Sequence, residues 1–246
     1  MNPFPREAPV FRSVLFQVAF WLWSVVMNLA WLPALLLPPR ATVIGQTVWA
    51  KGVMTLLRWI VGTRVEIRGR THLPSGPVIV ASKHQSAWDT IIFHIVTDDP
   101  AIVMKRELMW IPVYGWYCLK TRMIAIDRGS GPKALRGLIG AAETAVKSGR
   151  PIVIFPQGTR VAPGTKAPYL PGAAALYNKL QVPVVPVALN SGVFWPRRSW
   201  RRRQGTIVLE FLPAIPPGLD RRFFARRLED TLERESQRLV DEARRG

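Results

Sequence analysis

The stretch PVIVASKHQSAWDTIIFHIV, residues 77–96, decides how this chain folds. Its first six residues form an almost continuous apolar run, which is typical of a strand covered on both faces of a sheet. The last ten residues, from Ala87 on, read as a helix. The loop between them carries His84, five positions before Asp89. We therefore expect a strand, a polar loop and a helix, with the loop at the edge where a buried strand ends.

Six further runs resemble this first strand. They are bounded by turn residues and rich in Val and Ile, so each predicts a strand: RVEIRG (64–69), AIVMK (101–105), RMIAID (122–127), PIVIF (151–155), VPVVPVAL (182–189) and TIVLEF (206–211). The prolines inside VPVVPV predict an edge or irregular strand, because proline has no N–H for a ladder hydrogen bond.

Helical patterns alternate with these strands. They cover 132–149, with Gly149 as a C-terminal stop, 171–180, and a charged amphipathic segment at 221–245 that we expect to pack on the domain surface. The alternation predicts an α/β domain over residues 63–246, with a mixed, largely buried sheet flanked by helices.

The N-terminal 62 residues differ from the rest. No charged residue occurs between Arg12 and Arg40, an uncharged run of 27 residues that is long enough to span a bilayer. A second apolar stretch begins at Val43 but contains Lys51 and Arg58, which suits an interfacial helix with snorkelling cations better than a second full span. We expect residues 1–62 to form a two-helix membrane anchor. The alternative is a hairpin buried in a soluble core.

Composition narrows the possible partners. Lys and Arg number 34 against 16 Asp and Glu, which gives a formal net charge of +18 and implies an anionic partner such as a phospholipid surface, an acidic protein or nucleic acid. The aromatic residues lie mainly in apolar segments rather than among the arginines, which argues against nucleic acid. Cys118 is the single cysteine, so an intramolecular disulfide is excluded and a cytosol-facing location is favoured.

His84 and Asp89 alone allow two interpretations. If His84 lies in the loop and Asp89 in the first turn of the helix, the two side chains can meet as a base and its orienting acid. Alternatively, Ser86 is the N-cap and Asp89 merely completes a capping-box variant. No zinc-binding or other metal-ligand pattern occurs, so we expect no metal site, and we expect His94 in IIFHIV to be a core or interface histidine.

Cations also follow predicted strands. Lys105 ends AIVMK, Arg128 follows RMIAID, and Arg160 closes FPQGTR (155–160). The glycine-containing FPQGTR loop exposes backbone N–H groups beside a guanidinium that can hold a phosphate. If these strands end at one edge of the sheet, a base and three cations converge there. Each cation taken singly is equally explained as a solvated surface charge.

The ordered segments HQSAWDT, AIDRG, FPQGTR and VPVVPVALNSG resemble the four sequence blocks of the glycerolipid acyltransferases, most closely the bacterial 1-acyl-sn-glycerol-3-phosphate acyltransferases. The resemblance covers about residues 65–212. It implies that His84 is the general base and that Asp89 orients it. It also implies that Arg128 and Arg160 bind the acceptor's phosphate with Lys105 nearby, and that Gln157, Gly158 and Thr159 belong to the substrate loop.

The activity implied by this resemblance is transfer of a fatty acyl group to the 2-hydroxyl of lysophosphatidic acid, giving phosphatidic acid. Acyl-CoA or acyl-carrier protein is the donor, and no cofactor is needed. The implied location is the bacterial inner membrane, with the site facing the cytoplasm. The chain departs from the family at Gln157, where Glu is usual, and at Arg122 and Ala125, where Gly and an aromatic residue are usual.

Three other functions are compatible with the sequence. The first is acylation of another lyso-lipid, such as lyso-ornithine lipid. The second is a non-catalytic role as a basic membrane-surface or nucleic-acid-binding protein, which the net charge of +18 permits. The third is hydrolysis of a thioester or ester, which differs from acyl transfer only in whether water replaces the lipid acceptor.

Overall fold

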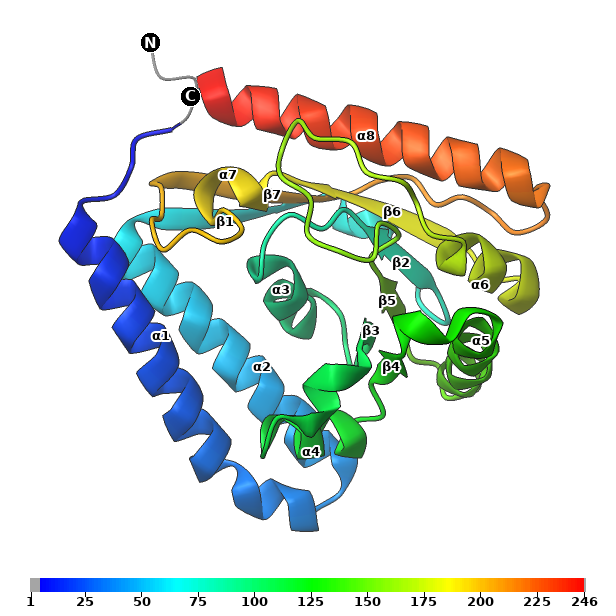
Figure 1. The fold of residues 1–246 in the computed structure, drawn as a ribbon, viewed down its shortest axis with the longest axis horizontal. Coiled ribbons are helices and arrows are strands. Elements are labelled where there is room, and N and C mark those ends of the chain that lie inside the picture. The colour runs from blue at the N-terminus through cyan, green and yellow to red at the C-terminus, as the bar shows by residue number, and fades with distance from the viewer. Residues whose placement is uncertain (1–4, 246) are drawn as a thin grey trace.

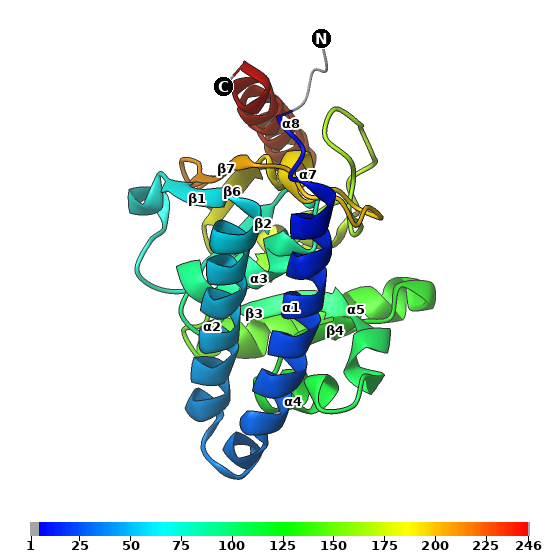
Figure 2. The same ribbon diagram turned by 90° about the vertical axis from the view of Figure 1, so that its left-hand side faces the viewer.

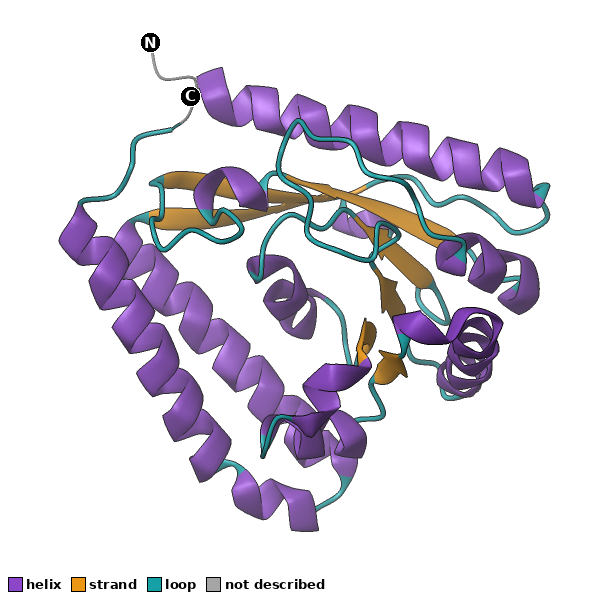
Figure 3. Cartoon of the chain, viewed as in Figure 1, coloured by secondary structure: helices purple, strands orange, loops and turns teal. Residues whose placement is uncertain are grey.

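In the computed structural model, which describes residues 5–245, one seven-stranded sheet organises the chain (Figures 1 and 3). Its strands run in the order β1-β7-β6-β2-β5-β3-β4. Their bounds are β1 (Thr63–Arg68), β2 (Ile79–Ser82), β3 (Ala101–Lys105), β4 (Ile124–Ile126), β5 (Ile152–Ile154), β6 (Val184–Leu189) and β7 (Gly205–Phe211). All neighbours pair in parallel except β6 and β7, which are antiparallel. The prediction of a mixed, largely buried sheet is confirmed.

Helices cover both faces of the sheet. Two N-terminal helices, α1 (Val10–Ala30) and α2 (Pro39–Leu56), lie on one side with α3 (Trp88–Val96), as Figure 1 shows. On the other face lie α5 (Gly131–Lys147), α6 (Gly172–Leu180) and the long α8 (Arg221–Arg245). The remaining short elements are α4 (Tyr114–Lys120), α7 (Ser191–Phe194), the π-helical turn η2 (Leu57–Val61) and the 3₁₀ helices η1 (Leu32–Leu36), η3 (Arg70–His72), η4 (Arg106–Trp110) and η5 (Arg128–Ser130).

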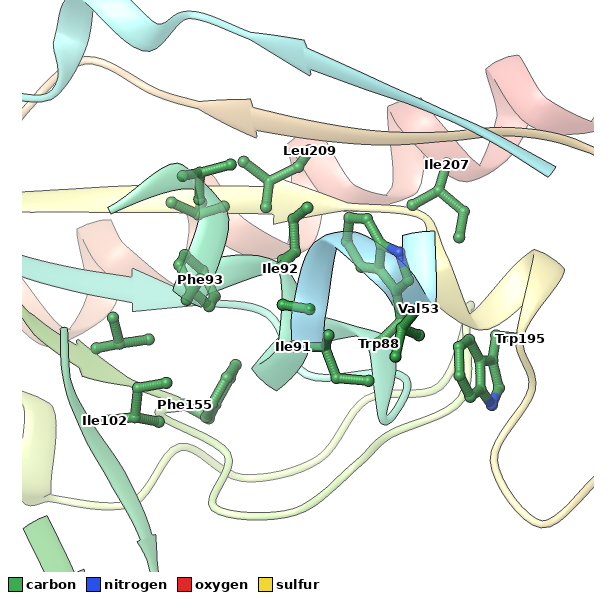
Figure 4. Packing of buried hydrophobic residues seen from close by; sticks show 14 of the residues in the cluster. Val53, Trp88, Ile91, Ile92, Phe93, Ile102, Phe155, Trp195, Ile207 and Leu209 are labelled. Carbon is green, nitrogen blue, oxygen red and sulfur yellow. The ribbon is translucent and has the colours of Figure 1, made fainter. Parts of the chain in front are cut away.

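Strand β2 shows how the sheet divides the core. Successive side chains point to opposite faces of a strand. Val80 accordingly packs in the cluster that contains α3, whereas Ile79 and Ala81 pack in the cluster that contains α5, α6 and α8. Trp88 is fully buried in the first cluster, close to Val53 of α2 and Ile207 of β7 (Figure 4). A sheet covered on both faces explains why its strands are continuous apolar runs.

The prediction of an edge position for VPVVPVAL is wrong, because β6 lies in the middle of the sheet between β7 and β2, but the alternative prediction of an irregular strand is confirmed. Pro186 is accommodated at a shift of register. The bridge Val184↔Ile215 and the pair Val187↔Phe211 are out of step by one residue, so a bulge lies opposite Pro186. The Pro186 carbonyl still accepts a hydrogen bond from Leu212 N at 2.9 Å. Because a bulge leaves a backbone donor unpaired in any case, the missing N–H of proline costs little here.

The N-terminal helices form an antiparallel hairpin, whose two helices lie side by side facing the viewer in Figure 2. Trp23 Nε1 donates to Trp49 O at 3.0 Å and Trp31 Nε1 donates to Ala41 O at 2.9 Å, so two indoles join α1 to α2. Helix α1 is long and apolar enough to cross a membrane. Only 22% of its most apolar 18-residue stretch is buried, so most of that stretch is exposed. Helix α2 begins at Pro39. Backbone N–H groups in the first turn of a helix have no acceptor within the helix, so the missing N–H of proline costs no hydrogen bond there. The division into an anchor and a domain at residue 62 stays a prediction, since Phe16 and Val53 share one buried cluster with β2 and α3.

Helix α8 crosses the β6 side of the sheet, as Figure 1 shows. It buries Phe224, Leu228, Leu232 and Leu239 at helical spacing, which confirms the prediction of an amphipathic helix packed on the domain. Helix α5 ends at Lys147, and Gly149 follows with a φ of 71°. A left-handed conformation of this kind is what glycine permits after a helix, so the predicted stop is confirmed.

Candidate active site

The Asp89 carboxylate organises the loop after β2. Asp89 is fully buried in the first turn of α3, and its Oδ2 accepts hydrogen bonds from the backbone N–H groups of Gln85 at 2.6 Å and Ser86 at 2.8 Å. Ser86 Oγ in turn accepts from Trp88 N at 3.2 Å. The helix begins at Trp88 with Ala87 at the N-cap, so the predicted cap at Ser86 is displaced by one residue. One bond of a capping box is present, from Ser86 N to the Asp89 carboxylate, whereas the Ser86 hydroxyl accepts from Trp88 N instead of Asp89 N.

His84 lies in this loop and contacts the same carboxylate. Its Nδ1 is 2.9 Å from Asp89 Oδ2, and its ring stacks on Phe155 with centroids 4.2 Å apart. A carboxylate oxygen can only accept, so the geometry assigns the donating proton of this contact to Nδ1 of the imidazole. That tautomer leaves a lone pair on Nε2. The side chain is 14% exposed, so this nitrogen belongs to a partly open site.

Ser191 completes the surroundings of Asp89. This contact between Ser191 and Asp89 was not predicted from the sequence. Ser191 is buried at the start of α7, directly beyond β6, and its Oγ donates to Asp89 Oδ1. Next to it, Gly192 N donates to Gln85 Oε1 at 3.0 Å. The signal was its place in the segment VPVVPVALNSG, because β6 is parallel to β2 and so ends at the same edge.

The loop after β5 passes beside His84. Val161 N donates to His84 O at 2.8 Å, which brings the predicted loop residues Gln157, Gly158, Thr159 and Arg160 to the same edge as the histidine. Gln157 and Gly158 are buried, whereas Thr159 and Arg160 are exposed. The Gly158 N–H donates within the loop to Phe155 O at 2.8 Å, so this particular amide, one of those expected to serve a reacting oxygen, is already used by the turn.

The other two predicted cations follow strands of the same edge. Strands β2, β5, β3 and β4 are parallel, so Lys105 at the end of β3 and Arg128 after β4 leave the sheet on the side of His84. Lys105 is exposed. Arg128 begins η5, and its side chain lies outside the described part of the structure. Arg106 also pairs with Asp127 at 3.5 Å, which joins the ends of β3 and β4.

A cavity of about 140 Å³ lies between the N-terminal hairpin, α3 and α4. Its walls are mostly apolar and include Met27, Trp31, Ile91, Ile102, Met104 and Tyr114. Thr90, the residue after Asp89, also lines it, whereas His84 does not. The cavity and Asp89 thus share helix α3, which lines the cavity with Thr90, Ile91 and His94.

The other two histidines lie away from the pair. His94 lines the cavity, and burial lowers its pKa to about 4. It is therefore an interface histidine, as expected. His72 Nδ1 is 2.9 Å from Phe211 O. Among residues 5–245, no group of three or more His, Cys, Asp or Glu side chains could hold a metal ion.

The basic stretch PRRSWRRR (196–203) is only partly a surface patch. Arg197, Arg198 and Arg201 are exposed, but Arg202 is buried, with its guanidinium 4.6 Å from the centroid of the Trp195 ring. Burial lowers the Arg202 pKa to about 10. Arg202 therefore holds α1 against this loop, where its guanidinium donates to Gln17 Oε1 at 3.2 Å, and is not available to a lipid headgroup or a carrier protein.

Comparison with known proteins agrees with this geometry. The family model for acyltransferases matches residues 64–190, which run from the second residue of β1 past the end of β6 and include the His84–Asp89 pair. The chain belongs to the acyltransferase family. Its first residues and α8 lie outside the stretch that the acyltransferase model matches.

Curated members of the family are similar over the same region. The 1-acyl-sn-glycerol-3-phosphate acyltransferase of Pseudomonas aeruginosa is 35% identical over 167 residues, which are 68% of this chain and 65% of that protein. The human 1-acyl-sn-glycerol-3-phosphate acyltransferase alpha is 31% identical over 190 residues, 74% of this chain and 67% of its own length. The chain thus spans about two thirds of these relatives, and slightly less of the Pseudomonas protein.

A solved structure shares the fold. The crystal structure of the 1-acyl-sn-glycerophosphate (LPA) acyltransferase PlsC from Thermotoga maritima superposes with a TM-score of 0.76 and covers 93% of this chain and 97% of its own. Identity is 20%, so the likeness concerns the fold alone. It extends well beyond residues 64–190 of the acyltransferase domain.

Proposed function

We propose that this chain transfers a fatty acyl group from an acyl thioester to the 2-hydroxyl of 1-acyl-glycerol-3-phosphate, making phosphatidic acid. The observation that carries the proposal is the His84–Asp89 contact of 2.9 Å at the carboxyl edge of the parallel strands, in a chain 35% identical to a protein named for this reaction. The donor is acyl-CoA or acyl-carrier protein, and the proposal requires no metal or other cofactor.

His84 is the general base of the proposed reaction. Its Nε2 takes the proton of the acceptor hydroxyl as the hydroxyl oxygen attacks the thioester carbonyl. The carbon–sulfur bond then breaks, and the imidazolium returns the proton to the departing thiolate. Asp89 holds the Nδ1–H tautomer and stabilises the imidazolium, while the Ser191 hydroxyl holds Asp89.

The loop at 155–160 and the neighbouring cations bind the acceptor. A guanidinium can grip a phosphate through two parallel hydrogen bonds, and we assign this task to Arg160 and Arg128, with Lys105 alongside. Gln157, Gly158 and Thr159 shape the loop. Because the Gly158 N–H is engaged, other amides of this loop contact the thioester oxyanion.

The cavity beside α3 suits an acyl chain. It is apolar, begins at Thr90 next to Asp89, and extends toward the hairpin formed by α1 and α2. Burial of methylene groups there is worth about 0.8 kcal/mol each. The reacting carbonyl would then lie near His84, with the hydrocarbon tail against Ile91, Met104 and Trp31.

A phospholipid surface would deliver such a substrate. The outward side of α1 exposes large apolar residues, including Phe11, Trp21 and Leu22. The segment from η4 to α4 adds exposed Trp110, Ile111, Trp116 and Leu119 near the tip of the hairpin. Tryptophan and basic residues together favour a membrane interface rich in anionic lipid. We place the protein on the cytoplasmic side of a bacterial inner membrane.

The deciding experiment is an assay of the purified chain with lysophosphatidate and, separately, acyl-CoA and acyl-carrier protein. Formation of phosphatidic acid by the parent and none by His84→Ala would support the proposal. Preference for lyso-ornithine lipid over lysophosphatidate would reassign the acceptor. Release of free fatty acid at the same rate with and without an acceptor would show a hydrolase instead.

A further inference from the structure

Glu233 of α8 lies at the centre of a partly buried polar cluster that the proposed chemistry does not use. Its Oε1 accepts from three donors: Lys83 Nζ at 2.5 Å, Tyr169 OH at 3.0 Å and Gln157 Nε2 at 3.4 Å. The donors come from three separate segments of the chain. Each of them is fixed by a single carboxylate oxygen on the C-terminal helix, 150 residues away from Lys83.

Two of these donors belong to the loops that form the site. Lys83 is the residue before His84, and Gln157 lies two positions after Phe155, on whose ring His84 stacks. The two loops are already joined by the hydrogen bond from Val161 N to His84 O. Glu233 of α8 joins the two loops a second time, because its carboxylate accepts from Lys83 of one loop and from Gln157 of the other.

The charges make this contact hard to replace. Lys83 is 3% exposed, and a buried ammonium without a partner is strongly unfavourable, so it needs a nearby negative charge. Gln157 is neutral and offers none. Its Oε1 is itself buried without a hydrogen-bond partner among the described residues. Glu233 is thus the negative charge that this cluster contains.

We propose that Glu233 is a positioning residue for acyl transfer: through Lys83 and Gln157 it holds the His84 loop and the 155–160 loop in the register that the reaction needs. The inference rests on the proposed function for its substrate, although not for its geometry. It gives α8, which lies outside the residues matched by the acyltransferase family model, a direct part in the site.

The test is to move the carboxylate within the cluster. Glu233→Gln keeps an oxygen acceptor but leaves Lys83 buried and unpaired, and we expect kcat with lysophosphatidate and acyl-CoA to fall about 10- to 100-fold, as for a site displaced by about an ångström. The double variant Q157E/E233Q returns one carboxylate to the cluster and should recover most of kcat. Glu229→Gln is the matched control, since Glu229 is exposed one turn earlier on α8.

Recovery by the double variant is what separates positioning from folding alone. Parent-like kcat in E233Q, or a folded double variant no better than E233Q, would overturn the inference. Should E233Q fail to fold, the variant K83M/E233L removes both charges together, which avoids the unpaired ammonium. If that variant folds, a lowered kcat supports the proposal and an unchanged kcat refutes it.

A readout independent of the acceptor separates this inference from the proposed function. Diethyl pyrocarbonate modifies accessible histidines. The modification rate of His84 is obtained by subtracting, for the parent, E233Q and E229Q in turn, the rate measured for the same chain carrying H84A. A changed rate at His84 in E233Q, but not in E229Q, supports the positioning role even if the parent does not acylate lysophosphatidate. An unchanged rate together with an unchanged kcat contradicts it.

Discussion

Ser191 donates a hydrogen bond to the buried carboxylate of Asp89 across 102 residues of chain. The contact couples the end of β6 to the start of α3 and engages Oδ1, while Oδ2 faces His84 and the backbone N–H groups of Gln85 and Ser86. Removing the hydroxyl would let the carboxylate turn away from the imidazole. We expect Ser191→Ala to lower kcat about 10-fold, because one buried hydrogen bond to a charged group is worth about 1.5 to 3 kcal/mol and part of that loss reaches the transition state.

The matching control is Ser148→Ala. Ser148 is exposed just beyond α5, and its Oγ bonds only to a helix carbonyl, at 3.0 Å. Its removal should leave kcat unchanged. Equal kcat values for Ser191→Ala and the parent would show that Asp89 does not depend on this contact.

Substitution of Asp89 should lower kcat far more than substitution of Ser191. Asp89→Asn preserves shape, but its amide nitrogen can only donate, so one orientation confronts the Nδ1–H of His84 with another donor. By analogy with serine proteases, in which the wrong tautomer costs about 10⁴ in kcat, we expect a loss of about 10³- to 10⁴-fold. Steady-state kinetics with lysophosphatidate would measure it. A loss below tenfold would mean that Asp89 serves mainly as the cap of α3.

Much of the fold could be predicted because the sheet is covered on both faces. All seven strands were found, and 101–105 and 221–245 match β3 and α8 to the residue. The segment from η4 to α4 was not predicted: its large apolar residues, such as Trp110 and Trp116, face outward and give no periodic pattern that marks a core. Pro186 wrongly favoured an edge position for β6, because the bulge that accommodates it depends on the paired strand and leaves no pattern in a single run.

The site could be predicted only where its residues are near in sequence or follow strands. His84 and Asp89 are five residues apart, and their contact follows from a helix start. Ser191 lies 102 residues from Asp89, and Glu233 lies 150 residues from Lys83 and 76 residues from Gln157. Neither contact leaves a local pattern, since it depends on strand order and on where α8 crosses the sheet. Lys83, which had no assigned role from sequence, obtains one only through Glu233.

Substitution of Arg160 should weaken binding of the acceptor more than it slows the chemical step. It is exposed at the end of the 155–160 loop, where a phosphate can reach it. Arg160→Ala should raise KM for lysophosphatidate about 10- to 100-fold, since a charge-assisted hydrogen bond is worth about 1.5 to 3 kcal/mol, and should leave KM for the acyl donor unchanged. Arg227→Ala, at an exposed position of α8, is the control. A fall in kcat with unchanged acceptor KM would instead place Arg160 at the reacting carbonyl.

Gly45 allows the two N-terminal helices to approach each other. A Cβ at this position of α2 would lie 2.3 Å from the Trp31 ring, so Gly45→Ala forces the indole away from its bond to Ala41. We expect a destabilisation of about 1 to 3 kcal/mol, seen as a lower Tm in detergent. Gly140→Ala is the opposite case: nothing lies within 4 Å of its added Cβ, and a helical alanine should stabilise α5 by about 0.5 to 1 kcal/mol. An unchanged Tm for Gly45→Ala would mean that Trp31 has room to move.

His94 should make stability depend on pH in the mildly acidic range. Burial lowers its folded-state pKa to about 4 from the ordinary histidine value of 6.5. The unfolded chain therefore takes up a proton below pH 6.5 while the folded chain does not, so the stabilising effect is complete above that pH and is lost as pH falls toward 4. The loss should reach on the order of 2 to 3 kcal/mol. Urea unfolding of the parent and of His94→Phe at pH 7 and pH 4.5 measures it: the parent should lose more stability than the variant between the two values. Equal losses would show that His94 takes up its proton in the folded protein as readily as in the unfolded chain.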